Sequence, residues 1–451
     1  MIYKFDLYKK HIKEMKKLLL FFTSVALSLS VSAQESRKIS LEEAISLGLE
    51  NSKVLKLSQA KVDQAVSRYE QTKDAALPTG TVSYVYNHAE IPTTTFQMGG
   101  GSEPFHLPTR ADAFIGTFGL QEVVFGGNRL RYAKESTSLL TKVANLDAEK
   151  DREDIIFNIT NAYFNLYKLQ QSQKVVQQNL ESIEQQIKQS QRFFEQGIVT
   201  KNDVLGFQLQ KSNIQLAGVD LETNRKIVVY NLDILLGLPE NTSLSVGEIT
   251  SVSNNLSGIN QFIDTALVNR TELSSLDLRT KVAETAIKSI KAELLPSVLV
   301  GANAYYINPS GKFIPPTNSF LAPLTVGATV AWNFDRLWMN KNKITEAKIE
   351  KRQVELSKDL TVDNVKTEVN QNYQNYQRAI ERIGILETAI TQARENDRIL
   401  ESKYRNNIAS VTDRIEAQTQ LYQSLINLEL AKADAGIAYY TLLKSAGTIS
   451  K

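Results

Sequence analysis

Residues 155–169 read IIFNITNAYFNLYKL, and this stretch decides the fold class of the chain. Its apolar residues recur at steps of three and four, which is the spacing of one face of an α-helix. Proline and glycine, which break or end helices, are absent from Asn128 to Gln196. The sequence therefore predicts one helix over 127–196, which at about 1.5 Å per residue is roughly 100 Å long.

A second stretch of the same kind closes the chain. From Ala328 to Lys451 there is no proline, and the only glycines are Gly384, Gly436 and Gly447. Helices as long as these are stable only when they pack on neighbours in a coiled coil or a bundle. We therefore expect a mostly α-helical protein, with further helices at 200–237, 338–405 and 410–446 and shorter ones within 41–76 and 260–295.

The chain contains two copies of one unit. Leu77-Pro78 matches Leu295-Pro296 at an offset of 218 residues, and Asp203 matches Asp413 at an offset of 210. Because such matches recur in the same order, we expect a duplicated unit of long helices and a β-hairpin. The copies span 34–238 and 260–451, with a linker over 239–259. Other matched pairs are Asn51 with Asn269, Tyr163 with Tyr373, and Gly237 with Gly447.

Alternating residues predict β-strands in the middle of each copy. Val298, Val300 and Ala302 alternate with Gly301 and Asn303, so that one face is apolar and the other is small or polar. Strands of membrane barrels have this pattern, and strands of soluble sheets share the alternation. Hairpins framed by long helices, with no other strand-rich region to complete a soluble sheet, favour the membrane. We expect strands at 79–88, 112–125, 297–307 and 323–334.

Four strands are too few to close a membrane barrel, for which about eight are needed. The strand prediction therefore requires several copies of the chain in one assembly.

The N-terminus carries a predicted secretory signal peptide over 1–33. Met15-Lys16-Lys17 precedes a short apolar run, which ends at Val31-Ser32-Ala33. Serines interrupt the run, and it is shorter than the ~20 residues of a membrane anchor. We expect the mature protein to leave the cytoplasm, with Met15 as an alternative translation start.

Composition argues against several classes of function. The 52 basic and 49 acidic residues leave a net charge of +3, so there is no bulk field that would attract nucleic acid. The chain has no cysteine and three histidines, which are not spaced as metal ligands. It also has no glycine-rich phosphate loop and no Ser/His/Asp grouping. We expect no enzymatic activity, no cofactor and no metal site.

Several motifs occur in a fixed order along the chain. They are Leu41-x-x-Ala44-Ile45-x-x-Gly48-Leu49-x-Asn51, Leu77-Pro78, Phe125-Gly126-Gly127-Asn128-Arg129, and the run from Gly197 to Leu205. With these motifs the sequence resembles the TolC family of outer-membrane efflux and secretion channels, over nearly all of the mature chain.

The resemblance implies a homotrimer. Its twelve strands would form an outer-membrane β-barrel, continuous with an α-helical barrel in the periplasm, and 239–259 would be an equatorial element. A periplasmic adaptor protein would connect it to an inner-membrane pump. The function implied is the passive exit of small molecules or drugs from a tripartite efflux pump. A type I protein secretion duct and a soluble periplasmic coiled-coil scaffold are the alternatives.

Two turns between long helices are the candidate docking site. Gly and Asn both tolerate the left-handed conformation that ends a helix, and Thr or Ser suits the start of the next one. A plain helix hairpin needs the same residues, so adaptor contact is implied only by the resemblance. The residues are Gly197, Ile198, Val199 and Thr200 in the first turn, and Asn407, Ile408, Ala409 and Ser410 in the second.

Acidic residues beside these turns are the candidate aperture. Asp413 and Glu416 stand three residues apart on one helical face, and Asp203 matches Asp413 in the first copy. The resemblance implies an acidic ring that selects cations, with Tyr404 at the gate. A capping aspartate and an ordinary surface glutamate are the alternative. The family's basic residue after the turn is replaced by Ala409, so Arg405 or Arg414 would have to supply a salt-bridge latch.

Overall fold

The computed structural model describes residues 37–93, 95–96, 105–106, 109–240, 242–247, 258–309 and 320–450. The predicted signal peptide, 1–33, lies outside the described residues. The chain separates into two compact units. The helical unit consists of Met1–Lys53, Arg152–Asp264 and Glu368–Lys451, and the sheet unit consists of Val54–Asp151 and Thr265–Thr367.

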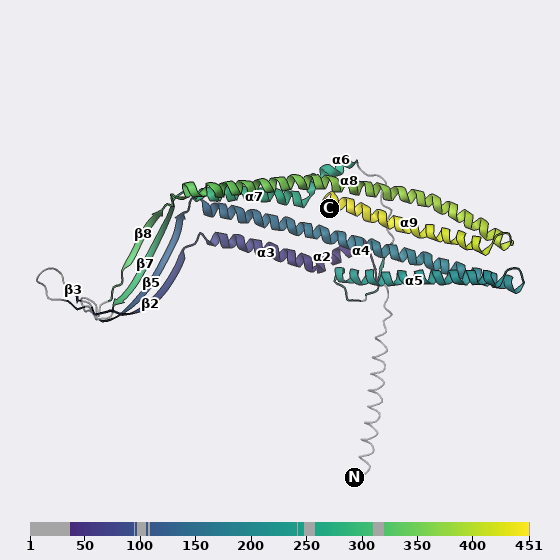
Figure 1. Cartoon of the computed structure of the whole chain (residues 1–451), viewed down its shortest axis with the longest axis horizontal. Coiled ribbons are helices and arrows are strands. Elements are labelled where there is room, and N and C mark those ends of the chain that lie inside the picture. The colour runs from purple at the N-terminus through teal and green to yellow at the C-terminus, as the bar shows by residue number, and fades with distance from the viewer. Residues whose placement is uncertain are drawn as a thin grey trace, which may run out of the picture. The chain divides into compact units, whose positions relative to one another are not determined.

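Two helical hairpins dominate the helical unit (Figure 1). The first is formed by α4 (Arg129–Glu195) and α5 (Lys201–Leu236), and the second by α8 (Arg336–Arg405) and α9 (Val411–Ser445). The first parts of α4 and α8, residues 129–151 and 336–367, belong to the sheet unit. Among the described helices, none has an apolar run long enough to cross a membrane. The shorter elements are α2 (Leu41–Asn51), α6 (Ile259–Asn269), and the parallel strand pair β1 (Arg37–Ile39) and β6 (Leu244–Val246).

Close packing of α9 on α4 forms part of the helical core. Phe164 of α4 is buried, and its ring centroid lies 5.7 Å from that of Tyr440 in α9. A Cβ atom at Gly436 would overlap the Phe164 ring, so the two helices approach closely because position 436 has no side chain. The Tyr163 hydroxyl donates to the backbone carbonyl of Ile39 at 3.3 Å and thereby holds β1 against α4.

One antiparallel four-stranded sheet, in the order β2-β5-β7-β8, lies at one end of the sheet unit (Figure 1). The sequence predicts two hairpins, and pairing between β5 and β7 joins them into a single sheet. Alternation within a strand cannot reveal this long-range pairing. The strands are β2 (Thr79–Glu90), β5 (Arg110–Phe125), β7 (Ser297–Pro309) and β8 (Leu324–Ala331), with a short pair, β3 (Thr95–Phe96) and β4 (Phe105–His106), and the helices α3 (Lys53–Asp74) and α7 (Thr271–Ala292).

The two faces of the sheet differ in chemistry. On one face, Tyr84 of β2 stacks with Phe114 of β5 at a centroid distance of 6.3 Å, and the neighbouring Val82 is 79% exposed. On the other face, the hydroxyl groups of Ser83 and Thr117 lie 2.6 Å apart in a hydrogen bond. The sheet therefore presents an apolar surface on one side and a polar surface on the other.

Each of the two shorter helical segments contains a break. The chain leaves the helical conformation at Ser52, between α2 and α3, with φ −58° and ψ 118°. It does so again at Arg270, between α6 and α7, with φ −63° and ψ 118°. The two breaks are separated by the same offset of 218 residues that relates the sequence motifs of the two copies.

Candidate docking and aperture site at the helical turns

The two turns of the helical unit share one backbone geometry. Gly197 and Asn407 occupy the left-handed region, with φ of 74° and 58°. In the first turn, the Gly197 N–H donates to the Phe194 carbonyl at 2.9 Å, and the Ile198 N–H donates to the Phe193 carbonyl at 2.8 Å. This is the Schellman arrangement, which satisfies the last carbonyls of a helix. The second turn has the same bonds, from Asn407 to Tyr404 at 3.0 Å and from Ile408 to Lys403 at 2.8 Å.

A capping box starts the helix after each turn. Asp203 Oδ2 accepts from the backbone N–H of Thr200 at 2.7 Å and from its hydroxyl at 2.8 Å. Asp413 Oδ2 accepts from the same two groups of Ser410, at 3.1 and 2.8 Å. Both helix starts are therefore fixed by a reciprocal pair of side-chain bonds. The cap explains these aspartates without any partner.

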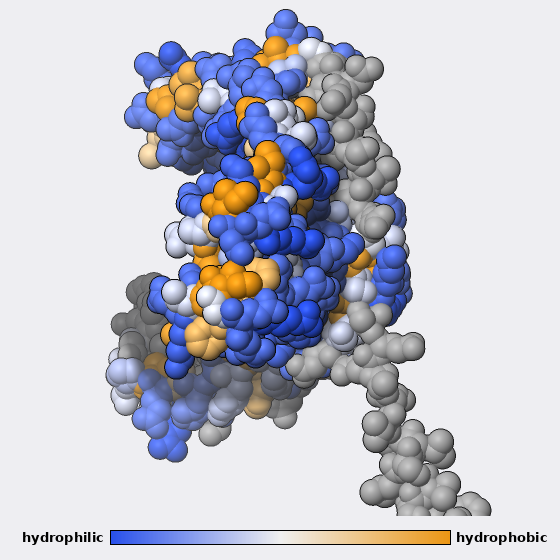
Figure 2. Space-filling view, turned by 90° about the vertical axis from the view of Figure 1, so that its right-hand side faces the viewer, coloured by the Kyte–Doolittle hydropathy of each residue, from blue (hydrophilic) through white to orange (hydrophobic). Residues whose placement is uncertain are grey.

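The turns present apolar side chains to the solvent. Ile198 is 43% exposed and Ile408 is 74% exposed, whereas Val199 and Ala409 are half-buried. From the end of the molecule that lies at the right in Figure 1, the surface is mostly hydrophilic, with hydrophobic residues in separate patches (Figure 2). Each turn therefore exposes one isoleucine side chain. These two side chains are apolar contact points of the candidate docking site within a mostly polar surface.

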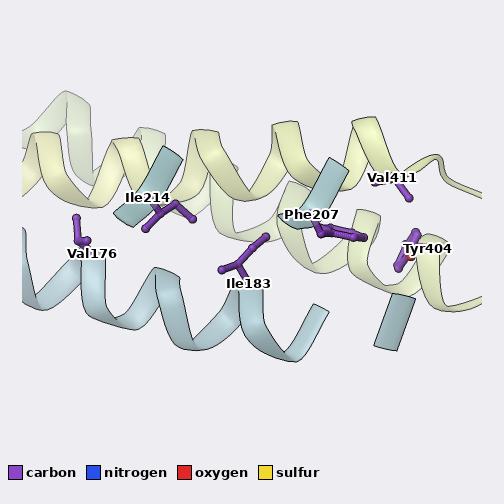
Figure 3. Packing of buried hydrophobic residues seen from close by; sticks show 6 residues of the cluster. All are labelled: Val176, Ile183, Phe207, Ile214, Tyr404 and Val411. Atoms are coloured by element: carbon purple, nitrogen blue, oxygen red, sulfur yellow. The ribbon is translucent and has the colours of Figure 1, made fainter. Parts of the chain in front are cut away.

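A hydrophobic cluster lies behind the turns and joins the two helical hairpins (Figure 3). Tyr404 of α8 is buried in it, with its ring centroid 6.1 Å from Phe193 of α4 and 5.7 Å from Phe207 of α5. Sequence reasoning singled out Tyr404 but missed Phe207, although its place on the inner face of the predicted helix was a usable signal. The buried members are Val176, Ile183, Phe207, Ile214, Tyr404 and Val411.

The hydroxyl of Tyr404 is enclosed in this cluster. Burial raises the pKa of Tyr404, and the neighbouring Ser190 hydroxyl opposes the rise. Within the described part of the chain, neither hydroxyl oxygen has a hydrogen-bond partner that meets normal geometry. Tyr404 therefore acts here as a core residue between the hairpins.

Arg414 and Arg405 already have partners on α8. Arg414 is buried and forms an ion pair with Asp397, and Arg405 pairs with Glu401 at 2.5 Å. Breaking the buried pair would leave a charge without compensation, which is strongly unfavourable. The expectation that Arg414 could serve as an external latch is therefore not supported, because its guanidinium is held inside the second hairpin.

Polar side chains also join α9 to α4. The Gln418 side-chain amide donates to Asn179 Oδ1 and to Ser182 Oγ, each at 3.1 Å, and it is buried. Its own oxygen has no partner within the described residues. The interface between the hairpins is therefore apolar near the turns and partly polar further along.

A family comparison decides the identity of this arrangement. The model of a family described as outer membrane efflux protein matches residues 44–238 and 262–448. The chain belongs to the outer membrane efflux protein family. The two matched segments cover most of the chain and leave out the region around the linker 239–259.

Solved structures of outer-membrane proteins have the same fold. VceC from Vibrio cholerae has 17% identity and a TM-score of 0.74, with 90% of this chain and 96% of that one covered. CmeC from Campylobacter jejuni has 14% identity and a TM-score of 0.74, with 91% and 87% covered. MtrE from Neisseria gonorrhoeae has 15% identity and a TM-score of 0.70, with 91% and 89% covered. No curated protein sequence matches significantly. The resemblance to TolC-like channels is thus confirmed.

In this family member, the candidate aperture acids differ in their surroundings. Asp413 is exposed, and hydrogen bonds from Ser410 hold the pKa of its carboxyl below the usual value. Glu416 is also exposed, one turn along α9, and among the described residues it accepts only a long 3.4 Å bond, from Gln420. Asp203 is half-buried at the start of α5. Glu416 is therefore the acid with the freest carboxylate.

No group of three or more His, Asp or Glu side chains in the described ranges is arranged to hold a metal ion. The chemistry available at the turns is therefore that of apolar contact and of exposed carboxylates.

Proposed function

We propose that this protein is the outer-membrane exit duct of a tripartite efflux pump. Three copies form a twelve-stranded barrel in the outer membrane, continuous with an α-helical barrel in the periplasm. Small molecules or drugs enter it from an inner-membrane pump through a periplasmic adaptor protein. The duct carries out no catalysis.

The single observation that carries this proposal is an exposed apolar stripe on α5. Its residues lie on a seam of three- and four-residue steps in which the polar residues Ser212 and Thr223 occupy two positions, and Leu209 and Leu216 are 65% and 64% exposed. A stripe of this kind on a long helix needs a partner, and a second copy of the chain is the partner that builds a helical barrel. The stripe consists of Leu205, Leu209, Leu216, Val219, Ile227, Tyr230 and Ile234.

The sheet supports the same assembly. Its outer strands, β2 and β8, each have one edge without a partner among the described strands. All neighbouring strands are antiparallel, so β8 of one copy and β2 of the next can pair antiparallel and close a ring. Val82 and Val326, 79% and 80% exposed, lie on the apolar face, which suits contact with lipid. This face argues against a soluble scaffold.

Equivalent local structures favour the duplicated unit. Besides the turns at Gly197 and Asn407, the ends of α5 and α9 match at Gly237 and Gly447, with φ of 69° and 66°. The Leu238 N–H donates to the Asp233 carbonyl, and the Thr448 N–H donates to the Leu443 carbonyl, each at 2.9 Å. Both pairs of turns are separated by 210 residues, as a duplication predicts.

Similar channels supply the functional context. CmeC and MtrE are described as outer membrane channels, MtrE in an open state, and CusC as forming a transmembrane channel. We infer that the turns 197–200 and 407–410 contact the adaptor through Ile198 and Ile408. Asp203, Asp413 and Glu416 line the periplasmic aperture in this proposal, with Tyr404 buried behind it.

Lysine substitutions in the stripe test the assembly. In Leu209→Lys with Leu216→Lys, two charges would enter each interface between copies, so we expect heat-resistant trimers to disappear from outer-membrane fractions. The matched control is Ala217→Lys with Asn224→Lys, exposed on the flank of α5 outside the stripe. Control trimers should persist. A wild-type protein recovered as a detergent-independent monomer in the periplasmic extract would favour the soluble scaffold instead.

A further inference from the structure

Both tryptophans of the chain lie where the sheet meets the helices. Trp332 follows β8, and its indole N–H donates to the Leu294 carbonyl, beyond the end of α7, at 3.0 Å. The ring centroids of Trp332 and Phe334 are 6.4 Å apart, and those of Phe334 and Trp338 are 5.8 Å apart. We call these three residues the aromatic anchor. All are more than half exposed, and large exposed aromatics at the end of an apolar sheet are typical of a membrane–water interface.

Exposed cations lie at the helix ends that adjoin the strands of the sheet unit. Lys341 lies three residues after Trp338 on α8, so the two side chains share one helical face. Lys291 lies in the last turn of α7, three residues before Leu294, whose carbonyl accepts from Trp332. We call the exposed cations at these helix ends the basic collar. They are Arg129, Arg131, Lys288, Lys291, Lys341 and Lys343.

Charge at this end of the sheet is unbalanced. Residues 126–135, 288–296 and 332–343 contain eight cationic side chains and three carboxylates. At the opposite end of β2 and β5, Glu90 pairs with Arg110 at 3.4 Å, and Asp112 accepts from Tyr86 and His88. Between the two ends of β2 and β5, the positive excess therefore lies, among the described residues, at the end that adjoins the helices.

The collar lies within reach of a lipid headgroup. Lys341 is the sixth residue of α8, and Lys288 lies four residues before the last residue of α7, so each is within roughly 10 Å of the end of its helix along the axis. Headgroup layers are about 5–7 Å thick, and lysine and arginine extend their charged ends along an apolar surface into them. Arg131, Lys288, Lys291 and Lys341 have no ion-pair partner within the described part of the chain, so their charges are available.

We propose that the basic collar and the aromatic anchor bind anionic phospholipid headgroups of the leaflet that faces the helices. The anchor sets the depth of the sheet in the membrane, and the collar selects phosphatidylglycerol-type lipids over zwitterionic ones. A cation held near an anionic surface favours binding electrostatically, and the attraction falls with salt. This inference rests on the proposed membrane position of the sheet.

Tryptophan fluorescence reads this surface directly, because Trp332 and Trp338 are the only two tryptophans. The full-length protein is reconstituted in phosphatidylcholine vesicles that contain brominated phosphatidylglycerol or brominated phosphatidylcholine, which quench tryptophan on contact. We expect phosphatidylglycerol to bind at least about fivefold more strongly at the tryptophans. The ratio of phosphatidylglycerol binding to phosphatidylcholine binding should fall to near one in the variant Arg131→Gln, Lys288→Gln, Lys291→Gln, Lys341→Gln. High salt should lower it in the wild type.

The control is Lys53→Gln, Lys56→Gln, Lys366→Gln, Lys403→Gln, which removes four exposed charges elsewhere and should keep the preference. Equal quenching by both brominated lipids in the wild type would overturn the collar and leave the channel proposal standing. An unchanged preference in the collar variant would also overturn it. If neither brominated lipid quenched the tryptophans, the proposed position of the sheet in the membrane would be contradicted. The proposed function would then be contradicted as well.

Discussion

At the scale of single residues, the aperture acids divide into a cap and a free carboxylate. Asp413 Oδ2 is engaged by Ser410, and the same holds for Asp203 and Thr200, so these aspartates have a structural role in any case. Glu416 has no such role. A cation-binding ring, if three copies bring these acids to one axis, would depend mainly on Glu416 and on the charge of Asp413.

The variant Asp413→Asn with Glu416→Gln separates charge from the cap. Asparagine keeps a side-chain oxygen that can accept both bonds from Ser410, so the turn should survive while the charge is lost. We expect trimers of normal heat resistance whose block by divalent cations is weakened by about tenfold. Single-channel recording in a planar bilayer measures this. Asp220→Asn with Glu387→Gln, both exposed elsewhere, is the control. Unchanged block in the double variant would refute the acidic ring.

Asp233 is a residue that sequence reasoning missed. It is fully buried near the end of α5, and neither carboxylate oxygen has a hydrogen-bond partner among the described residues. Burial raises the pKa of Asp233 to about 6, and the nearby Thr242 N–H only partly opposes the rise. The folded state therefore prefers the neutral carboxyl. This preference stabilises the protein below the unfolded pKa, and the benefit is lost as the pH rises through about 6.

The variant Asp233→Asn stays neutral at every pH. Relative to the wild type, we expect its free energy of unfolding to gain roughly 3 kcal/mol between pH 4 and pH 8. Thermal unfolding of the detergent-solubilised protein across this pH range measures the difference in midpoint. Asp220→Asn, on the exposed face of the same helix, should show no such trend. A constant gap between the variant and the wild type would contradict the assigned burial effect.

At the scale of secondary-structure elements, two helical glycines have opposite environments. A Cβ at Gly436 in α9 would overlap the Phe164 ring, whereas a Cβ at Gly384 in α8 would meet nothing within 4 Å apart from its chain neighbours and the backbone of its own helix. Gly436→Ala should therefore destabilise the protein by about 1–3 kcal/mol through overpacking. Gly384→Ala should stabilise it by about 0.5–1 kcal/mol, because alanine is the better helix former. Equal shifts of the thermal midpoint in both variants would contradict the packing of α9 on α4.

The elements that could be predicted from the sequence are those with local causes. The positions of proline and glycine predict the long helices, and Thr200 with Asp203 predicts a helix start, which the structure shows as a capping box. Both could be predicted because the effects act within a few residues. The joining of β5 to β7 and the Arg414–Asp397 pair depend on residues far apart or on opposite helices. The sequence places Tyr404 just before the second turn, but its burial depends on Phe193 and Phe207 from the other hairpin.

At the scale of the whole molecule, one copy leaves large apolar surfaces uncovered. The α5 stripe and the apolar face of the sheet together expose more hydrophobic side chains than a monomeric soluble protein normally does. Lipid would cover the sheet face, and neighbouring copies would cover the stripe. In the proposed assembly, the pore would therefore belong to no single chain.

Planar-bilayer recording on the purified protein, with its oligomeric mass determined on the same sample, tests the exit duct most directly. The account predicts a trimer that gives discrete conductance steps. It also predicts that Leu209→Lys with Leu216→Lys abolishes both the trimer and the steps, while Ala217→Lys with Asn224→Lys keeps both. A monomeric wild-type protein, or a trimer that inserts into the bilayer without conducting at any voltage or ionic condition, would contradict it.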